Sequence, residues 1–401
     1  MLRTPFYRIF QFTMRLASYF LGIKEPHIIE GENSLTKIPL LLKEKGLKKP
    51  LVVTDKGIHL LNLLNPLFES LKKEDLEFGY FHDVVANPTI KNVNDGLEVY
   101  RSSGCDSIIV VGGGSAMDVA KMIGALASNP TKTVEKLKGI LKIRKALPFL
   151  VAVPTTAGTG SETTLAAVIV NEQTHHKYAI NDPHLIPKYA VLDPTLLVGL
   201  PPKITSTTGM DALTHAVEAF IGHSNTKKTK KSAIEAVKLI NKNLYLSYQD
   251  GKNLTYRKNM QKAAFLAGVA FTRAYVGYVH AIAHSLGGKY NVPHGLANAI
   301  ILPYILEDFG RKVYSQLARL SDEISLCEKS LSKKEKAEKF IAWIRELNKK
   351  MEIPDKFDIS YKTKDVEEMI LHAFKEGNPL YPVPKEFSKS DFREIYRKIL
   401  K

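Results

Sequence analysis

Three continuous apolar runs in the first half of the chain constrain its fold more than any other feature. They cover residues 51–54, 107–111 and 150–153, and they are rich in Val, Ile and Leu. Such runs are typical of strands that are buried on both faces, as in a parallel sheet. Helical patterns at residues 92–103 and 117–126 lie between them and would serve as crossover connections. The first half is therefore predicted to be an α/β domain with a parallel sheet.

The second run ends in a glycine-rich turn, residues 112–115, that opens the next predicted helix. Glycine lets the backbone approach a phosphate closely, and a helix N-terminus presents N–H groups to an anion. Ser115 adds a hydroxyl, and Asp118 in the first helical turn would complement the helix dipole or orient the loop. This turn predicts a phosphate cradle, with a tight turn that binds no ligand as the alternative.

Two further strand ends support a dinucleotide site. Residues 155–162 form a loop rich in hydroxyls and glycine after the third run, and Asp55 ends the first run. Ligands of open α/β sheets bind beyond the carboxyl ends of strands, where a carboxylate accepts a hydrogen bond from ribose and repels a 2′-phosphate. NAD(H) is therefore expected in preference to NADP(H), although Lys56 next to Asp55 weakens the argument.

Composition and charge exclude several classes of protein. The 401 residues are 44% hydrophobic and 24% charged, which is ordinary for a folded chain of two or three domains. Cys105 and Cys327 are too few for a disulfide scaffold or a thiolate metal site, and they suit the cytoplasm. The net charge is +16, of which residues 201–401 carry +12. Because no nucleic-acid motif accompanies runs such as 227–231, we expect solvated lysines and no nucleic-acid partner.

Histidines and one carboxylate at helical spacing form a candidate metal site in the second half. Asp211 and His215 are four residues apart, His280 and His284 repeat that spacing, and His294 follows a predicted turn. Residues four apart share one helix face. Three imidazoles and one carboxylate suit Fe²⁺ or Zn²⁺ rather than Mg²⁺ or Ca²⁺. Spacing alone does not decide whether His280 or His284 is the ligand.

Four segments together resemble the iron-dependent (group III) alcohol dehydrogenase family, notably its lactaldehyde/propanediol, butanol and 1,3-propanediol dehydrogenases. The segments are Gly112–Asp118, Pro154–Glu162, Gly209–Phe220 and His280–Ile300, and the similarity extends over nearly the whole chain. The resemblance implies a dehydroquinate synthase-like architecture. An α/β NAD-binding domain over residues 25–200 and an all-helical metal-binding domain over residues 201–401 would enclose the site in a cleft.

The resemblance also implies roles for single residues. The metal ligands would be Asp211, His215, His280 and His294, with His284 as a catalytic group near the substrate. Together with the loops above, the predicted cofactor-binding residues are Asp55, Asn87, Gly113, Gly114, Ser115, Asp118, Thr155, Thr156, Thr159 and Lys177.

The expected activity is NAD-dependent hydride transfer between a primary alcohol or diol and its aldehyde, with Fe²⁺ or alternatively Zn²⁺. The alternative is glycerol dehydrogenase or another polyol or hydroxy-acid dehydrogenase of the same fold. Family members are commonly dimers or larger, so a homo-oligomer is expected.

Residues 1–24 stand apart as a basic, aromatic extension without acidic residues, and we expect no counterpart in shorter family members. Arginines every few residues argue against a transmembrane span or a signal peptide. The segment is predicted to be an amphipathic helix packed on the fold or on a partner subunit, with weak membrane-surface contact as the alternative. A second departure is Asn378-Pro379-Leu380, where the family usually has Asn-Pro-Arg.

Overall fold

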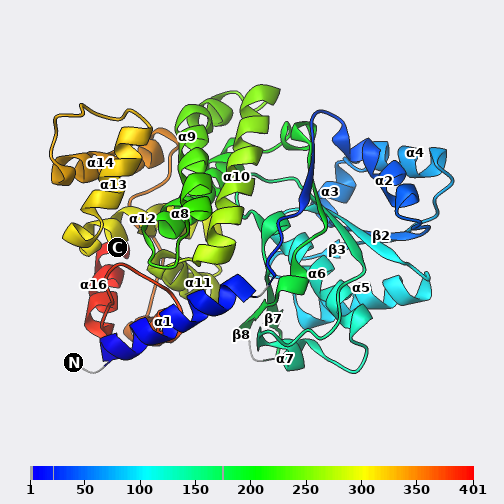
Figure 1. Ribbon diagram of the computed structural model, residues 1–401, viewed down its shortest axis with the longest axis horizontal. Coiled ribbons are helices and arrows are strands. Elements are labelled where there is room, and N and C mark those ends of the chain that lie inside the picture. The colour runs from blue at the N-terminus through cyan, green and yellow to red at the C-terminus, as the bar shows by residue number, and fades with distance from the viewer. Residues whose placement is uncertain (1–2, 21, 174–175) are drawn as a thin grey trace. The chain divides into compact units, whose positions relative to one another are not determined.

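The computed structural model describes residues 3–20, 22–173 and 176–401, and the chain divides into two compact units. One unit comprises residues 22–199, and the other joins residues 1–21 to residues 200–401. Figure 1 shows the first as a mixed α/β unit and the second as a helical unit to which the N-terminal helix belongs.

A six-stranded parallel sheet forms the centre of the unit of residues 22–199. Its order is β1-β9-β6-β4-β2-β3. The strands are β1 (His27–Glu30), β2 (Pro50–Asp55), β3 (Gly79–Val84), β4 (Ser107–Gly112), β6 (Phe149–Pro154) and β9 (Tyr189–Leu192). The three predicted runs are β2, β4 and β6, which lie side by side within the sheet. The parallel sheet predicted from the sequence is therefore confirmed.

Helices connect these strands as the helical patterns predicted. The helices are α2 (Ile38–Glu44), α3 (Lys56–Leu60), α4 (Asn65–Lys73), α5 (Ile90–Ser102), α6 (Gly114–Ser128) and α7 (Val134–Leu137). Helix α5 packs closely on α6, because a Cβ added at Gly96 would lie 2.5 Å from Cδ1 of Ile123. A small second sheet of β5 (Gly139–Ile140), β7 (Ala166–Asn171) and β8 (His176–Asn181) was not predicted.

The second unit is helical, as predicted. Its helices after residue 200 are α8 (Pro202–Ile221), α9 (Lys227–Gln249), α10 (Leu254–Ala274), α11 (Tyr278–Tyr290), α12 (His294–Phe309), α13 (Tyr314–Glu323), α14 (Lys333–Lys350), α15 (Thr363–Gly377) and α16 (Lys389–Ile399). Among its described residues, one bridge between Phe357 and Leu400 is the only strand-type pairing. At the start of α9, Lys227, Lys228 and Lys231 are exposed, as expected for solvated lysines.

Helix α8 lies inside this unit and packs against α9, α10 and α12. It is buried on nearly all sides from Thr205 onward. Asp211, His215 and Glu218 are each no more than 4% exposed on this helix. Buried polar and charged groups are unfavourable unless they are paired or bind a ligand, so these side chains need partners.

Residues 3–20 form helix α1 (Arg3–Phe20), which packs on the helical unit. Gln11 donates hydrogen bonds to the carbonyl oxygens of Pro379 and Tyr381, at 3.0 and 2.9 Å. The prediction of a helix packed on the fold is thus confirmed. No single described helix is long and apolar enough to cross a membrane; α10 and α11 pass that test only as a pair bent by 103°.

Candidate functional site

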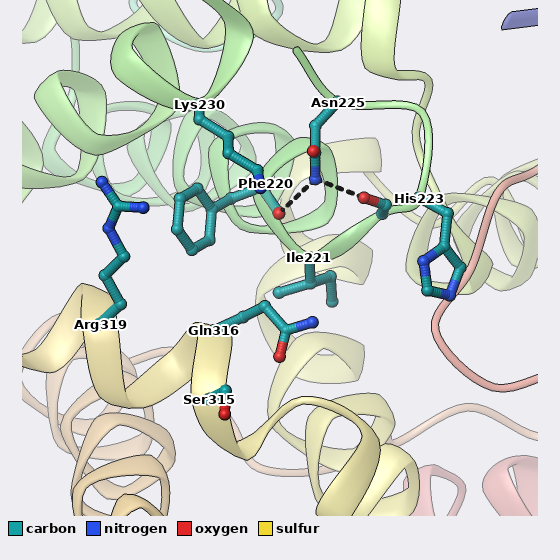
Figure 2. A pocket seen from close by; sticks show the side chains of 9 residues that line it. Phe220, Ile221, His223, Asn225, Lys230, Ser315, Gln316 and Arg319 are labelled. Carbon is teal, nitrogen blue, oxygen red and sulfur yellow. Dashed lines mark hydrogen bonds between the residues drawn. The ribbon is translucent and has the colours of Figure 1, made fainter. Parts of the chain in front are cut away.

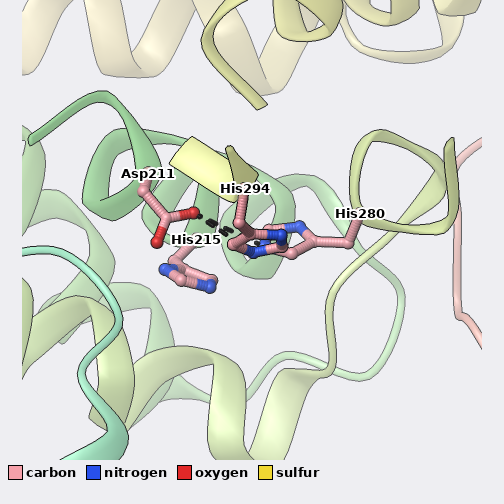
Figure 3. A group of neighbouring side chains, drawn as sticks. All are labelled: Asp211, His215, His280 and His294. Carbon is pink, nitrogen blue, oxygen red and sulfur yellow. Dashed lines mark ion pairs between the residues drawn. The ribbon is translucent and has the colours of Figure 1, made fainter. Parts of the chain in front are cut away.

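Four side chains from three helices converge in the helical unit (Figure 3). They are Asp211 and His215 of α8, His280 of α11 and His294 at the start of α12. One ligand atom from each lies within 4.8 Å of the others. Nε2 of His294 is 3.5 Å from Oδ1 of Asp211, and Nε2 of His280 is 3.9 Å from the same oxygen. The structure therefore brings together the four residues that the family resemblance implied as ligands.

Local packing explains this convergence. The four-residue spacing on α8 places Asp211 and His215 on one face. The His215 ring stacks on Phe271 of α10, with ring centroids 4.2 Å apart. A Cβ added at Gly295 would lie 2.4 Å from the backbone oxygen of Thr207. Glycine at this position therefore lets the start of α12 approach α8, which brings His294 close to the other three residues of the group.

Glu218, which the sequence analysis missed, holds His280 in position. Its Oε2 accepts hydrogen bonds from Nδ1 of His280 at 2.6 Å and from the backbone N–H of Gly277 at 2.8 Å. Its Oε1 accepts from the N–H of Val279 at 2.9 Å. Burial raises the pKa of Glu218 to about 8, although the hydrogen bonds act to lower it. Burial also holds the pKa of His280 well below its usual range. When Glu218 is ionised, this bond places the proton on Nδ1 of a neutral His280, so Nε2 carries the lone pair that a metal needs.

The surroundings of Asn298 on α12 test whether the four residues fit a cation. Its Nδ2 is 2.6 Å from Oδ1 of Asp211 and 3.2 Å from Nε2 of both His280 and His294. An amide has two N–H donors, which cannot satisfy three acceptors. Its buried Oδ1 has no hydrogen-bond partner among the described residues. The carboxylate of Asp211 and the imidazoles of His280 and His294 thus lie together with too few N–H donors, and the four residues would hold one divalent cation.

His284 lies beside this group and is not part of it. Its ring stacks on that of His294, with centroids 5.2 Å apart. Its Nδ1 is 2.6 Å from Oε1 of Glu376, which also accepts a hydrogen bond from the Tyr381 hydroxyl at 2.7 Å. Both His284 and Glu376 are about one-third exposed, so this pair meets solvent while the four-residue group is mostly buried. The arrangement can pass a proton between the site and solvent.

A cavity of about 230 Å³ in the same unit is separate from this group (Figure 2). Phe220, His223, Lys230, Gln316 and Arg319 are among the residues that line it. None of the residues lining this cavity belongs to the group of four or is His284. The convergence of side chains, and not the size of this cavity, therefore locates the candidate site.

In the α/β unit, the predicted strand-end loops lie together. The backbone N–H of Thr155, after β6, donates to the carbonyl of Gly112 at the end of β4, at 3.1 Å. A Cβ added at Gly113 would lie 3.6 Å from the Thr156 side chain, and one at Gly114 would lie 3.0 Å from Thr159. Helix α6, which includes Ser115, begins without a side-chain N-cap. Its first N–H groups, glycines and neighbouring hydroxyls can hold a phosphate.

Asp55 lies at the same edge of the sheet. Its Oδ1 accepts a hydrogen bond from the N–H of Ile58 at 3.0 Å and caps α3. Its Oδ2 would lie 3.7 Å from a Cβ added at Gly112. Lys56, the neighbour that weakened the argument for NAD(H), forms an ion pair with Asp83 at 3.3 Å. Asp55 is therefore close to the glycine-rich turn, with one carboxylate oxygen engaged in capping.

Asp118 orients the hydroxyl-rich loop. Its Oδ2 accepts from the N–H of Val168 at 3.1 Å, and its Oδ1 accepts from the Ser161 hydroxyl at 3.4 Å. Nearby, Nζ of the fully buried Lys121 donates to Ser161 and to both oxygens of Thr164, at 2.9–3.1 Å. Burial raises the pKa of Asp118 and lowers that of Lys121. Of the two roles that the sequence left open, these contacts favour orientation of the loop.

Asn87 and Lys177 contact each other, although they are far apart in the sequence. Nζ of Lys177, on β8, donates to Oδ1 of Asn87 at 2.9 Å. Asn87 has a left-handed backbone with φ of 55°. Asn87 and Lys177, the two predicted cofactor residues outside the strand-end loops, are therefore in direct contact.

Comparisons with known proteins cover most of the chain. Residues 26–194 match the family described as iron-containing alcohol dehydrogenase, and residues 205–400 match the C-terminal region of the Fe-containing alcohol dehydrogenase family. Alcohol dehydrogenase 4 of Schizosaccharomyces pombe is 39% identical over 364 residues, which is 89% of this chain and 84% of that protein. NAD-dependent methanol dehydrogenase of Bacillus methanolicus is 33% identical over 352 residues, covering 88% of this chain and 92% of the relative.

A diol dehydrogenase matches over almost the full length. The 1,3-propanediol dehydrogenase of Citrobacter freundii is 36% identical over 394 residues, or 98% of this chain and 99% of that protein. Such a match must reach into residues 1–24, so this relative has residues that align with part of that segment. A crystal structure of a 1,3-propanediol oxidoreductase, 36% identical, covers 95% of this chain and 100% of its own with a TM-score of 0.91. The chain therefore belongs to the iron-containing alcohol dehydrogenase family.

Proposed function

We propose that this oxidoreductase interconverts a primary alcohol or diol and its aldehyde with NAD(H) and one divalent cation. The observation that carries the proposal is the convergence of Asp211, His215, His280 and His294 within 4.8 Å in the helical unit. Relatives named for 1,3-propanediol and methanol support simple alcohols and diols as substrates. The same names do not favour the alternative of a glycerol dehydrogenase.

Fe²⁺ is proposed as the native ion, with Zn²⁺ as the alternative. Three imidazoles and one carboxylate are a donor set that both ions accept, whereas Mg²⁺ and Ca²⁺ prefer oxygen ligands. The name of the family supports iron. Because affinity alone does not determine which ion is loaded in a cell, metal analysis of anaerobically purified protein decides between the two.

NAD(H) is proposed as the cofactor in preference to NADP(H). Asp55 lies near the glycine-rich turn, and a carboxylate there repels a 2′-phosphate. Lys56, next to Asp55, could attract a 2′-phosphate, but its ion pair with Asp83 partly neutralises its charge. This ion pair therefore supports the choice of NAD(H). The NAD-dependent methanol dehydrogenase among the relatives is consistent with it.

Each residue of the site has a proposed part in the reaction. When bound, the cation supplies a Lewis acid for the substrate oxygen and the nicotinamide exchanges a hydride with the substrate carbon. Glu218 keeps His280 neutral and oriented. His284 moves the proton at Nε2, since its Nδ1 is engaged with Glu376. In alcohol oxidation the hydroxyl proton leaves through His284 toward solvent, and the hydrogen on the carbinol carbon would leave as hydride, with both electrons of its bond, to NAD⁺.

A substrate and cofactor panel tests the proposal. Propanal, 3-hydroxypropanal, lactaldehyde and their alcohols are assayed with NAD(H) and NADP(H) on protein loaded anaerobically with Fe²⁺ or Zn²⁺. We expect turnover with at least one aldehyde–alcohol pair, higher kcat/KM with NAD(H), and loss of turnover after chelation. Full activity after complete metal removal would refute the proposed metal role, and equal activity with NADP(H) would refute the role of Asp55.

Two substitutions separate ligation from proton transfer. His280→Ala is expected to abolish both metal binding and turnover, because the variant loses one of four ligand atoms. His284→Ala is expected to keep the metal and lose rate. Metal loss in His284→Ala, or full metal content in His280→Ala, would reverse the two assignments.

A homodimer or larger assembly and a cytoplasmic location are also part of the proposal. The first follows the family resemblance, and the second is supported by two free cysteines, Cys105 and Cys327. Light scattering coupled to size exclusion measures the assembly, and fractionation of the source cells measures the location.

A further inference from the structure

Helix α1 presents an exposed apolar face that the dehydrogenase function does not use. Phe6, Ile9, Phe12 and Leu16 are three or four residues apart, so they share one side of the helix. Their exposed fractions are 61%, 63%, 64% and 52%. We call these four side chains the outer face of α1. Figure 1 draws this helix at the margin of the helical unit.

The polar side of the same helix faces the protein. Nη1 of Arg8 donates to the carbonyl of Val383 at 2.9 Å, and its Nε is 3.3 Å from Oε1 of Glu386. The buried Gln11 bonds to two carbonyls of the same C-terminal segment. An amphipathic helix on a water-soluble fold normally buries its apolar side and exposes its polar side. Here the orientation is reversed, so the exposed apolar side is the one that needs an explanation.

The size of the outer face argues against a dimer held together by two α1 helices alone. From the ordinary areas of such side chains, roughly 450 Å² of apolar surface is exposed, which is large for a contiguous patch. Two such faces packed together would bury about 900 Å², whereas stable interfaces bury about 1,200 Å² or more.

Charge argues in the same direction. Residues 1–24 contain Arg3, Arg8, Arg15 and Lys24 and no acidic residue. A symmetric pairing of two α1 helices would bring like charges together with no carboxylate from either helix to compensate. An anionic surface has the complementary charge. An exposed apolar face with phenylalanines, on a helix without acidic residues in a chain of net charge +16, fits the interface of an anionic bilayer.

We propose that the outer face of α1 docks on an anionic lipid bilayer and holds the enzyme at the membrane surface. The helix lies parallel to the membrane surface, because hydrogen bonds and an ion pair hold its polar side to residues 379–386 of its own unit. Phe6 and Phe12 enter the boundary between headgroups and acyl chains, while the net positive charge of the chain, +16, attracts the protein to anionic headgroups. This surface is separate from the candidate metal site, so binding does not need the catalytic residues.

Vesicle flotation of the full-length, metal-loaded enzyme tests the proposal. The vesicles are phosphatidylcholine alone or phosphatidylcholine mixed with phosphatidylserine. We expect binding to the anionic vesicles to be on the order of 10- to 100-fold tighter, and to weaken with rising salt. Phe6→Ser combined with Phe12→Ser should weaken binding by about tenfold or more, with an unchanged melting temperature because both side chains are exposed. Phe12→Glu alone should weaken binding to the anionic vesicles further than Phe12→Ser.

A matched control removes similar apolar surface elsewhere. Leu60 and Leu61 are 76% and 66% exposed in the α/β unit, so Leu60→Ser combined with Leu61→Ser should leave vesicle binding unchanged. Absence of binding to anionic vesicles by the natural chain, or equal binding by the double phenylalanine variant, overturns the proposal. Light scattering measures the oligomeric state of the natural chain and of the double phenylalanine variant. If the natural chain is an oligomer and the variant is not, the outer face is a subunit interface and the proposal fails.

Discussion

Replacing Glu218 by Gln should weaken metal binding although Glu218 is not itself a ligand. The carboxylate accepts three hydrogen bonds, from Nδ1 of His280 and from the backbone N–H groups of Gly277 and Val279. An amide of the same shape has one acceptor oxygen, and its NH₂ group must face one of these donors. Either a backbone N–H loses its acceptor, or His280 loses the bond that keeps its proton on Nδ1.

The size of the effect follows from these contacts. A partner that orients a ligating histidine contributes about 10- to 100-fold to metal affinity, which corresponds to about 1.4–2.7 kcal/mol. The unsatisfied donor in this buried place should also lower the free energy of unfolding of the metal-free protein by about 1–3 kcal/mol. The two effects are separable because the second persists without metal.

Competition between the protein and a chromogenic chelator for Zn²⁺ measures the affinity, and urea unfolding of the stripped protein measures the stability. Asp182→Asn is the matched control, because Asp182 is equally buried and accepts from the N–H of Ile143 at 3.0 Å in the other unit. It should lose stability and keep metal affinity. A Glu218→Gln variant that binds Zn²⁺ within about twofold of the natural chain would refute the reasoning about orientation.

Three further predictions concern other parts of the molecule. Glu376→Gln should lower kcat and shift the pH–rate profile while metal content stays unchanged, because Glu376 holds Nδ1 of His284; an unaltered profile would contradict this. Lys121→Met should destabilise the protein by about 3–5 kcal/mol in urea unfolding, because it leaves Asp118 and several oxygens without their buried cation, and a loss below about 1 kcal/mol would contradict it. Burial raises the pKa of Glu162 from 4.5 to about 7, so the folded state keeps a proton that the unfolded chain loses. The stability from this group is present below about pH 4.5 and is lost as pH rises through 7, by at most about 3 kcal/mol; Glu162→Gln should remove that dependence, as unfolding at several pH values would show.

The parts of the fold that follow from continuous sequence patterns were predictable. Residues 51–54, 107–111 and 150–153 became β2, β4 and β6, because continuous apolar runs between helices have few other folded forms. Strand β3 alternates buried and half-buried residues over Gly79–His82 and lies at the edge of the sheet, so its signal was weaker. The small second sheet pairs the two-residue β5 with distant β8, and such a pairing leaves no periodic pattern in the sequence.

At the site, the spacing of histidines indicated a metal but could not separate His280 from His284. The two side chains lie on the same side of α11, with ring centroids 6.0 Å apart. Their carboxylate partners differ: Glu218 on α8 holds His280, and Glu376 on α15 holds His284. These partners are about 60 to 90 residues away in the sequence, so only the tertiary structure assigns them. A local signal for Glu218 did exist, since it is seven residues after Asp211 and shares its helix face.

The extension was left open between packing on the fold and contact with a partner or membrane. The hydrogen bonds of Gln11 show the first, and they also explain why the alternatives were hard to separate. Arg8 and Gln11, on the polar side of the helix, are the residues that bind the protein. The spacing of apolar residues shows that a helix has an apolar and a polar side, but it does not show which side faces the protein.

The central claim is that Asp211, His215, His280 and His294 hold one divalent cation on which turnover depends. The most direct test titrates Fe²⁺ under argon into chelator-stripped protein, while bound iron and aldehyde-dependent NADH oxidation are measured in the same samples. We expect activity to rise from near zero in proportion to bound iron, to level off at one equivalent per chain, and not to appear in His280→Ala. Full activity in the stripped protein, or an unchanged titration curve for His280→Ala, would contradict it.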